Sequence, residues 1–453
     1  MGKLFGTDGV RGVAGKDLTC ELALQIGRGT AAVLTSLDGH RPKILIGKDT
    51  RVSGDMLEST LAAGLCSVGA DVELLGVIPT PGVAYLVRKY NADAGIMISA
   101  SHNPMEFNGI KIFKGDGYKL PDEVENQIEA HVFNNCTDIR LAEGADIGRI
   151  KMCRTGVKDY VDFLQEHIDA DLTGLKVLFD CANGASARVA QELFPRLGCE
   201  CGFIGTQQDG VSVNDGCGST HLETLEAAVK QGGYDCGIAF DGDADRCLAV
   251  DERGQVLNGD KIMYICAKHF KERGQLPSNT LVTTVMSNFG LYKALDKAGI
   301  RYEKTAVGDR YVYENMKEND FMIGGEQSGH IIFRKYAHTG DGLITALMLM
   351  QVMIDTQLPL SVLAAGVTMY PQVLKNVRVD DKDLTLADAA VQAAVDECTA
   401  ELGDSGRVLL RKSGTEPVLR VMAEAGTAEE CEKQVDRIIA AMEKSGHLIE
   451  VKK

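Results

Sequence analysis

The chain repeats one pattern of hydrophobic and polar positions through most of its length. Each repeat is a short run rich in Val, Ile and Leu, then a polar loop with Gly or Pro, then a stretch with the apolar spacing of an amphipathic helix. This alternation predicts parallel strands connected by helices, and ligands of such sheets bind beyond the carboxyl ends of the strands. The runs are KILIGKD (43–49), VELLGVIPTP (72–81), AGIMISASHNP (94–104), KVLFDCANGA (176–185), CGIAFDGDADR (236–246), TLVTTVMSN (280–288) and FMIGGEQSGH (321–330).

The pattern breaks at three places. A polar, weakly periodic stretch (134–150) ends the first segment, and a hairpin pattern, CLAVDERGQVLNGD (247–260), ends the second. Beyond 367–379, GRVLLRKSGTEPVLRVMAEA (406–425) predicts two strands around a Gly loop, and TAEECEKQVDRIIAAMEK (427–444) predicts a capped terminal helix. We therefore predict an α/β protein with three similar α/β domains (1–150, 151–255 and 256–370) whose sheets are mixed but mainly parallel, and a C-terminal α+β domain (371–453).

The amino-acid composition limits which kinds of molecule the protein is expected to bind. The 48 Lys and Arg against 64 Asp and Glu give a net charge of −16, which disfavours nucleic acid or an anionic membrane as the main partner. The apolar run LITALMLMQVMI (343–354) is too short to span a bilayer, which needs about 20 residues. The N-terminus has no apolar signal segment, and 13 Cys, an odd number, do not indicate a disulfide framework. These features predict a cytoplasmic protein with no membrane partner.

The loop DGDADR places Asp241, Asp243 and Asp245 at alternate positions directly after an apolar strand. An extended backbone would turn all three carboxylates to one side, and Mg²⁺ prefers oxygen ligands that converge in this way. An EF-hand is disfavoured, because Arg246 stands where its loop requires Gly and the following CLAV alternates like a strand. A solvated acidic turn is the remaining alternative.

The loop ISASHNP offers a serine nucleophile at the end of the strand GIMI. Ser99 and Ser101 lie close to His102 in the sequence, and a serine in such a loop either attacks a substrate or caps backbone amides. A bound cation favours the nucleophile, because metal lowers the charge penalty of a phosphoserine and stabilises its transfer.

Two further loops carry groups suited to a phosphorylated sugar. GGEQSGH (324–330) offers a carboxylate, an amide, a hydroxyl and an imidazole that can pair with sugar hydroxyls, or can form a helix-capping turn. RKSGTEPVLR (411–420) offers cations and hydroxyls around a glycine, which can wrap a phosphate; a hairpin with an exposed basic turn is its alternative. In a chain of charge −16, this concentration of donors favours the anion site.

Other nucleotide and hydrolase motifs are weak or missing. GRGTAA (27–32) fits the dinucleotide pattern G-x-G-x-x-A, but the preceding ELALQI has helical spacing, whereas that fingerprint follows a strand. Neither G-x-x-x-x-G-K-[ST] nor G-x-S-x-G is present. A kinase or an α/β-hydrolase is thereby disfavoured.

With ISASHNP, DGDADR, GEQSGH and RKSGTEP in that order, the chain resembles the phosphohexomutase superfamily along essentially its whole length. FGTDGVRG (5–12), GKDTRVSG (47–54) and GEQSGH are most similar to the phosphoglucosamine mutase branch; phosphomannomutases and phosphoglucomutases usually differ there. Lys412 departs from the usual phosphate loop, and we expect this to change loop stiffness rather than reaction class. The resemblance implies four domains around a central cleft, each contributing one loop.

The resemblance also implies an isomerase that interconverts glucosamine 6-phosphate and glucosamine 1-phosphate through a phosphoserine and a 1,6-bisphosphate, supplying amino-sugar nucleotide and cell-wall precursors. The bisphosphate would be intermediate and activator, and a small sugar phosphate would be the partner, with a homodimer left open. By motif match, Ser101 would carry the phosphoryl group and, with the three aspartates, hold one Mg²⁺. The remaining roles would be charge neutralisation by Arg11 and Arg246, proton transfer by His102 and Lys111, sugar reading by Glu326, Ser328 and His330, and binding of the distal phosphate by Arg411, Ser413, Gly414, Thr415 and Arg420.

Three alternatives stay open at this point. A phosphomannomutase or phosphoglucomutase would share the motifs but prefer another sugar. A metal-dependent sugar phosphatase would release inorganic phosphate instead of an isomer. A non-catalytic sugar-phosphate sensor would be expected to lack the serine or the acidic triad, and this chain keeps both.

Overall fold

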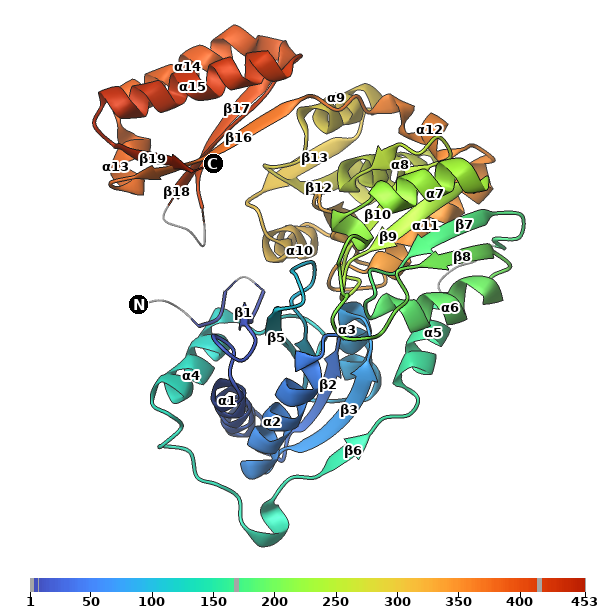
Figure 1. Cartoon of the computed structure of the whole chain (residues 1–453), viewed down its shortest axis with the longest axis vertical. Helices are drawn as coiled ribbons and strands as arrows, with labels where there is room; N and C mark the ends of the chain where they lie inside the picture. The colour runs from blue at the N-terminus through green and yellow to red at the C-terminus, as the bar shows by residue number, and fades with distance from the viewer. Residues whose placement is uncertain (1–3, 7, 167–170, 414–417, 453) are drawn as a thin grey trace. The chain divides into compact units, whose positions relative to one another are not determined.

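The computed structural model describes residues 4–6, 8–166, 171–413 and 418–452 (Figure 1). Within these residues the strands form four separate sheets, of six, five, four and four strands. Contacts divide the chain into two compact units, Met1–Met286 with Ile300–Ala365, and Ser287–Gly299 with Gly366–Lys453. The first three sheets lie in the first unit and the fourth lies in the second.

The first sheet has the strand order β1-β5-β4-β2-β3-β6. Its central pairs run parallel, whereas β5 pairs antiparallel with both β4 and β1. Ile26, Leu61 and Ile128, from three different helices, share one buried core with Ile44 and Ile96 of the sheet, so these helices cover one face. The elements are β1 (Val10–Val13), α1 (Cys20–Asp38), β2 (Lys43–Lys48), α2 (Ser53–Ser67), β3 (Asp71–Val77), α3 (Thr80–Lys89), β4 (Ala94–Ile98), β5 (Phe107–Lys114), α4 (Asp122–Phe133) and β6 (Ile150–Met152).

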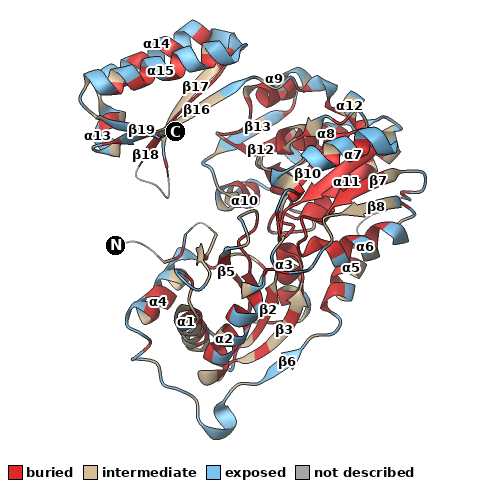
Figure 2. Cartoon of the chain, in the orientation of Figure 1, coloured by how far each residue is buried: buried red, intermediate tan, exposed pale blue. Residues whose placement is uncertain are grey.

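The second sheet has the order β11-β10-β9-β7-β8, with β8, β7 and β9 parallel and β10 returning antiparallel. Every residue of β9 and β10 is buried, as the red strands in Figure 2 show. The predicted hairpin after DGDADR is confirmed as β10 and β11. The elements are α5 (Gly156–Glu166), β7 (Lys176–Asp180), α6 (Ser186–Arg196), β8 (Glu200–Ile204), α7 (Glu223–Gly232), β9 (Cys236–Phe240), β10 (Cys247–Asp251) and β11 (Val256–Leu257).

The third sheet has the order β13-β12-β14-β15; its pairs are parallel except for β14 with β15, which is antiparallel. The apolar run at 343–354 forms a buried helix, α11, which begins where Asp341 Oδ1 accepts the Ile344 N–H (3.0 Å). The elements are α8 (Gly259–Glu272), β12 (Thr280–Thr284), α9 (Phe289–Ala298), β13 (Arg301–Thr305), α10 (Asp309–Glu318), β14 (Ile323–Gly325), β15 (Ile331–Phe333), α11 (Gly342–Thr356) and α12 (Leu360–Leu363). Of these, α9 belongs by its contacts to the second unit.

The second unit contains an antiparallel sheet of order β17-β18-β16-β19. Buried Glu424 ties α9 to this sheet, because its carboxylate accepts from the Phe289 N–H (2.9 Å) and from Arg407 Nε (2.6 Å). The predicted helix at 427–444 is confirmed with a Thr427 cap, but a further strand, β19, follows it. The remaining elements are β16 (Gln372–Val379), α13 (Lys382–Ala387), α14 (Ala389–Leu402), β17 (Arg407–Lys412), β18 (Val418–Glu424), α15 (Ala428–Lys444) and β19 (Leu448–Lys452).

Three mixed, mainly parallel sheets and one antiparallel sheet with helices confirm the predicted fold class. GRGTAA lies inside α1, as its context predicted. Among the described residues no single helix is long and apolar enough to cross a membrane; α11 with the segment Leu360–Gly366 passes on length and composition only as a pair bent by 93°. All 13 cysteines are free thiols.

Candidate active site

Three of the predicted loops occupy the same structural position in the three domains of the first unit. Each loop joins the last parallel strand of its sheet to the strand that returns antiparallel: β4 to β5, β9 to β10, and β14 to β15. ISASHNP, DGDADR and EQSGH therefore all lie at carboxyl ends of strands, where ligands of α/β sheets bind. We call residues 99–106 the Ser101 loop and 241–246 the acidic loop.

Ser101 is buried and directly contacts the acidic loop. Its side-chain hydroxyl donates to Asp241 Oδ2 at 2.6 Å, and His102 Nδ1 lies 3.3 Å from Ser101 Oγ. The residue is only 1 % exposed, and its backbone has φ of 56°, in the left-handed region that few non-glycine residues adopt. The contact joins residues 140 positions apart, and it brings the predicted nucleophile to the predicted metal site.

The three aspartates converge, but not for the reason predicted from their spacing. One ligand oxygen from each of Asp241, Asp243 and Asp245 lies within 4.8 Å of the others. The expectation of an extended backbone was wrong: the loop is a turn, and Ala244 within it has φ of 55°. A Cβ on Gly242 would lie 2.7 Å from the Ser101 carbonyl oxygen, so glycine is needed where the two loops meet.

Lys111 lies between two carboxylates of this triad. Its Nζ is 2.7 Å from Asp243 Oδ2 and 3.3 Å from Asp245 Oδ2. Burial alone would lower the pKa of Lys111, but the neighbouring Asp243 and Asp245 raise this pKa by more than burial lowers it. The amine is therefore held as a cation. Thr80 also binds Asp243, through Oγ1 to Oδ2 (2.6 Å) and through its N–H to the carbonyl oxygen (2.9 Å).

The donor set of the triad fits a hard divalent cation. Oδ1 of Asp243 and Oδ1 of Asp245 are buried and accept no hydrogen bond from any residue that the structure describes, although the other oxygen of each is paired. Burial and the two neighbouring carboxylates raise the pKa of Asp241 well above its usual range. Burial also opposes ionisation of Asp245, but Lys111 and Arg246 hold its pKa well below the usual range.

Two arginines predicted to neutralise phosphoryl charge lie around this cluster. Arg246 Nε is 4.0 Å from Asp245 Oδ1, and Arg11 Nη2 pairs with Asp8 Oδ2 at 3.2 Å. Burial and the charges of Arg246 and Arg11 lower the pKa of His102 to about 4, so its ring is neutral near pH 7. A neutral imidazole beside a serine hydroxyl can accept a proton.

His330 faces carboxylates of two domains. Nδ1 is 3.7 Å from Asp245 Oδ1, and Nε2 is 3.6 Å from Asp309 Oδ2. Burial lowers the pKa of His330, but Asp245, Asp309 and Glu326 raise it to about 9, which favours the imidazolium. A contact with Gly340 argues against the imidazolium. The Gly340 N–H donates to His330 Nε2 at 2.9 Å, and Nε2 of an imidazolium has no lone pair to accept this hydrogen bond. Since the backbone fixes that amide, we assign the neutral ring with its proton on Nδ1.

The other two residues predicted to read the sugar lie in the same turn. Glu326 Oε1 accepts the Gly308 N–H at 3.0 Å, and burial raises the pKa of this carboxyl. Ser328 Oγ is buried without a hydrogen-bond partner in the described structure. Their assignment to the sugar stays a prediction.

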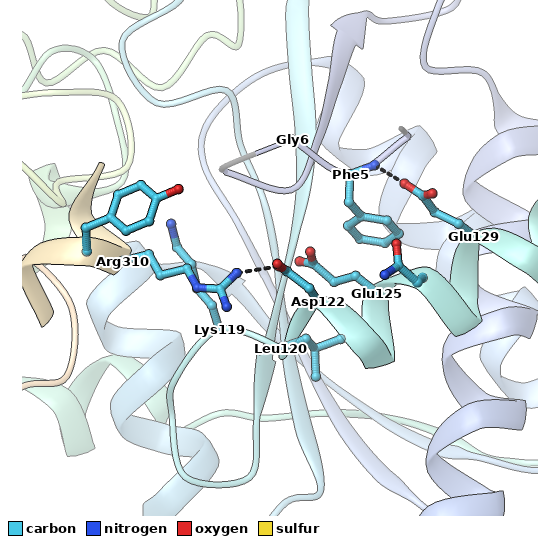
Figure 3. A pocket seen from close by; sticks show the side chains of 10 residues that line it. Phe5, Gly6, Lys119, Leu120, Asp122, Glu125, Glu129 and Arg310 are labelled. Atoms are coloured by element: carbon cyan, nitrogen blue, oxygen red, sulfur yellow. Dashed lines mark hydrogen bonds and ion pairs between the residues drawn. The ribbon is translucent and has the colours of Figure 1, made fainter. Parts of the chain in front are cut away.

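The first and third domains are also joined through Lys119, which pairs with Asp8 and Asp309 at 2.8 Å each. Lys119 lines a pocket of about 200 Å³ between α4 and α10, where Arg310 pairs with Asp122 and Glu129 accepts the Phe5 N–H (Figure 3). Burial and the nearby Asp122 raise the pKa of Glu125 to about 7. Cations and acids alternate here and pair with one another, which is typical of a joint between domains.

The predicted phosphate loop lies in the second unit, at the hairpin of β17 and β18. Arg411 and Arg420 are directly opposite each other in this ladder. Burial and the charge of Arg420 lower the pKa of Arg411. Ser413 is buried and its N–H donates to the Val418 carbonyl (3.0 Å). Gly414 and Thr415 lie outside the described residues.

Four residues at the site were missed by sequence reasoning. Asp49 and Arg51 follow β2 inside GKDTRVSG, and their place after a strand was a usable signal. Asn214 donates through Nδ2 to the carbonyl oxygens of Ser101 (2.8 Å) and Asn103 (3.1 Å), and Thr80 binds Asp243. No motif marks Asn214 or Thr80, because their partners are more than 100 positions away.

Family profiles match all four parts of the chain. They are described as phosphoglucomutase/phosphomannomutase alpha/beta/alpha domain I (residues 2–138), domain II (158–254), domain III (258–370) and C-terminal domain (374–441). A curated relative from Oceanobacillus iheyensis, named phosphoglucosamine mutase, is 53 % identical over 98 % of this chain and 99 % of its own length.

Solved structures with the same fold are more distant in sequence. A phosphoglucomutase/phosphomannomutase family protein from Burkholderia thailandensis has a TM-score of 0.83 at 24 % identity, covering 100 % of this chain and 99 % of its own. An Aspergillus fumigatus N-acetylphosphoglucosamine mutase, in complex with GlcNAc-6P and magnesium, has a TM-score of 0.68 at 17 % identity, covering 98 % and 96 %. With four family domains in order and a relative of this similarity along its whole length, the chain belongs to the phosphoglucomutase/phosphomannomutase family.

Proposed function

We propose that this protein interconverts glucosamine 6-phosphate and glucosamine 1-phosphate through a phosphorylated Ser101 and a 1,6-bisphosphate. The observation that carries the proposal is the 2.6 Å contact of the Ser101 hydroxyl with Asp241 in a triad whose carboxylates converge. The choice of sugar rests on the relative that is 53 % identical and named phosphoglucosamine mutase. Such a reaction would supply amino-sugar nucleotide and cell-wall precursors.

Asp241, Asp243, Asp245 and the phosphate on Ser101 are the groups that would hold Mg²⁺. When bound, the cation would offset phosphoryl charge and stabilise its transfer. The buried Oδ1 atoms of Asp243 and Asp245, which accept no hydrogen bond in the described structure, support this assignment. Lys111, held between the same two aspartates, keeps their second oxygens in place and adds a fixed positive charge.

The side chains around Ser101 suggest how protons and charge are handled. In the first half-reaction the bond from phosphorus to Ser101 Oγ breaks and a bond to the free sugar hydroxyl forms; that hydroxyl gives up its proton, and Oγ gains a proton to become the serine hydroxyl again. In the second, the Ser101 hydroxyl gives up its proton and receives the other phosphoryl group of the bisphosphate, and the sugar oxygen that this group leaves gains a proton. The neutral ring of His102, 3.3 Å from Oγ, is our candidate proton acceptor, with Arg11 and Arg246 offsetting phosphoryl charge.

Recognition would be divided between two loops. Glu326, Ser328 and His330 are proposed to read the sugar hydroxyls. Arg411, Ser413, Gly414, Thr415 and Arg420 are proposed to bind whichever phosphate is not reacting, because the bisphosphate must present its two ends to Ser101 in turn. The two arginines opposite each other on β17 and β18 support an anion site.

The proposal is tested by product analysis. Purified, phosphorylated protein with Mg²⁺ is incubated separately with glucosamine, glucose and mannose 6-phosphates, and the products are identified. We expect the 1-phosphate isomer in each reactive case and the highest kcat/KM for the amino sugar. Steady release of inorganic phosphate would indicate a phosphatase, a higher kcat/KM for glucose or mannose would move the chain to a sister branch, and no turnover would favour a sensor.

We also propose the cellular compartment in which the protein acts. Free thiols at all 13 cysteines support a reducing cytoplasm. Light scattering of the purified protein would decide whether it forms the homodimer left open by the sequence.

A further inference from the structure

Arg51 is a fully buried arginine that holds the Ser101 loop by its backbone. It lies between β2 and α2, and its side chain is 0 % exposed. The guanidinium donates to the carbonyl oxygens of Ser101 (3.0 Å), Asn103 (2.8 Å), Pro104 (2.5 Å) and Phe107 (3.1 Å). A planar guanidinium has five donors in a fixed fork, whereas lysine offers three from a single point. One side chain thus holds the loop from the nucleophile to the start of β5.

Asp49 connects the same arginine to the nitrogen of Ser101. Asp49 Oδ2 accepts from Arg51 Nε (2.9 Å) and from Ser99 Oγ (2.6 Å), and Ser99 Oγ in turn accepts the Ser101 N–H (2.9 Å). Asp49 and Ser99 are as buried as Arg51. The chain of contacts ends on the backbone of Ser101, whereas its Oγ contacts Asp241 and His102.

The backbone of Ser101 needs such support. Its φ of 56° is a conformation that a non-glycine residue keeps only where the surroundings enforce it. Arg51 and Asn214 both donate to the Ser101 carbonyl oxygen, one from the first domain and one from the second. The peptide groups on both sides of the nucleophile are therefore fixed, and this sets the direction of Oγ.

We propose that Arg51 is a positioning residue for phosphoryl transfer, which acts through the Ser101 loop and through Asp49 and Ser99 to aim Ser101 Oγ at the acidic loop. The inference rests on the proposed function for the role of Ser101 as phosphoryl carrier. In-line transfer depends on the position of the attacking or leaving oxygen, and a displacement of about 1 Å can cost about 100-fold in rate. The effect should therefore fall on kcat rather than on KM.

Arg51→Lys tests the proposal, because it keeps a buried cation and removes the fork. We expect kcat to fall about 100-fold with KM within about three-fold of the wild type. Hydrogen exchange of the amides of residues 100–107 should speed up by at least about ten-fold while the rest of the first domain is unchanged. Ser99→Ala, which removes only the link from Asp49 to the Ser101 N–H, should lower kcat about ten-fold. Peptide mapping must show the phosphate on Ser101 in each variant.

Lys48→Gln is the matched control, since Lys48 ends β2 beside Asp49 but pairs with Asp55 and Glu58 on α2. We expect its kcat and its loop exchange to match the wild type. The proposal is overturned if Arg51→Lys keeps kcat within about three-fold, or if it unfolds and Ser99→Ala behaves like the wild type. A wild-type protein that isomerises no sugar phosphate would defeat the proposed function instead, and loop exchange in the variants would still decide whether Arg51 holds the loop.

Discussion

The Ser101 site and the hairpin of β17 and β18 are both proposed to bind phosphate, but their charged side chains are arranged in opposite ways. At the Ser101 site, cations and carboxylates alternate, as with Lys111 between Asp243 and Asp245. In the C-terminal hairpin, Arg411 and Arg420 stand directly opposite each other. Like charges opposite each other destabilise a ladder, and Arg420 with burial lowers the pKa of Arg411.

This difference in charge arrangement suits a reacting centre at the Ser101 site and a phosphate-binding site in the hairpin. A reacting centre benefits from groups already fixed by one another, because they need no rearrangement as charge develops. A clamp benefits from positive side chains gathered in one place, because their charges act together on a bound phosphate. Changes at the Ser101 site should therefore remove the chemical step, whereas changes in the hairpin should weaken binding in both directions alike.

Ser101→Ala should have the largest effect, a loss of about 10³-fold or more in mutase activity with the fold intact, because no neighbouring group can carry the phosphoryl group. Activity in both directions and circular dichroism would measure it. Ser99→Ala should lose only about ten-fold in kcat and should keep its phosphate on Ser101. Peptide mapping that located the phosphate on Ser99 would reverse the assignment.

Removal of the metal should have the second-largest effect on activity. Chelation should stop turnover and Mg²⁺ should restore it, and Asp243→Asn should lower activity roughly 10²- to 10³-fold, because a cation supplies several kcal/mol of charge stabilisation. Calorimetric measurement of metal affinity would show whether the lower activity of Asp243→Asn comes from weaker metal binding or from general damage to the protein. Asp180→Asn is a matched control, since Asp180 is a buried carboxylate of the same domain that accepts backbone N–H groups of Ala182 and Gly218. Full activity of Asp243→Asn in metal-free buffer would end the metal assignment.

The residues that the sequence revealed are those whose chemistry is local. Three aspartates within five positions predicted a cation site, and their carboxylates do converge although the assumed extended backbone was wrong. The alternation of apolar runs and helices likewise predicted the sheets, since it follows from which faces must be buried. The strand β19 escaped prediction because it is short and mostly exposed, so burial leaves little pattern in it.

The residues that the sequence did not reveal act across long separations. Arg51 and the Ser101 loop are about 50 positions apart, and Asn214 is 113 positions from Ser101. His330 was predicted to read a sugar, and nothing in its motif indicated that it would face Asp245 and Asp309. Such contacts depend on how whole domains pack, which a local pattern does not specify.

Arg420→Ala should weaken catalytic efficiency about 10- to 150-fold in the forward and reverse directions together, because a charge-assisted contact to phosphate contributes about 1.5–3 kcal/mol. More bisphosphate should also escape into solution, since the same group would retain it during reorientation. Metal affinity should not change. Assays in both directions, with and without added bisphosphate, would measure this; unchanged efficiency with no extra release would show that the hairpin is an exposed basic turn.

Lys412→Ala should have the smallest effect, although Lys412 is next to Arg411 and carries the same charge. Its amine pairs with Asp383, and the two side chains are 42 % and 81 % exposed, so solvent screens the pair. Exposed pairs of this kind contribute about 0–1 kcal/mol to stability, and we expect catalytic efficiency within about three-fold of the wild type in both directions. The same assays as for Arg420→Ala give the comparison directly. A loss above about ten-fold, equal in both directions, would place Lys412 in the phosphate clamp and would mean that the departure at this position changes binding rather than loop stiffness.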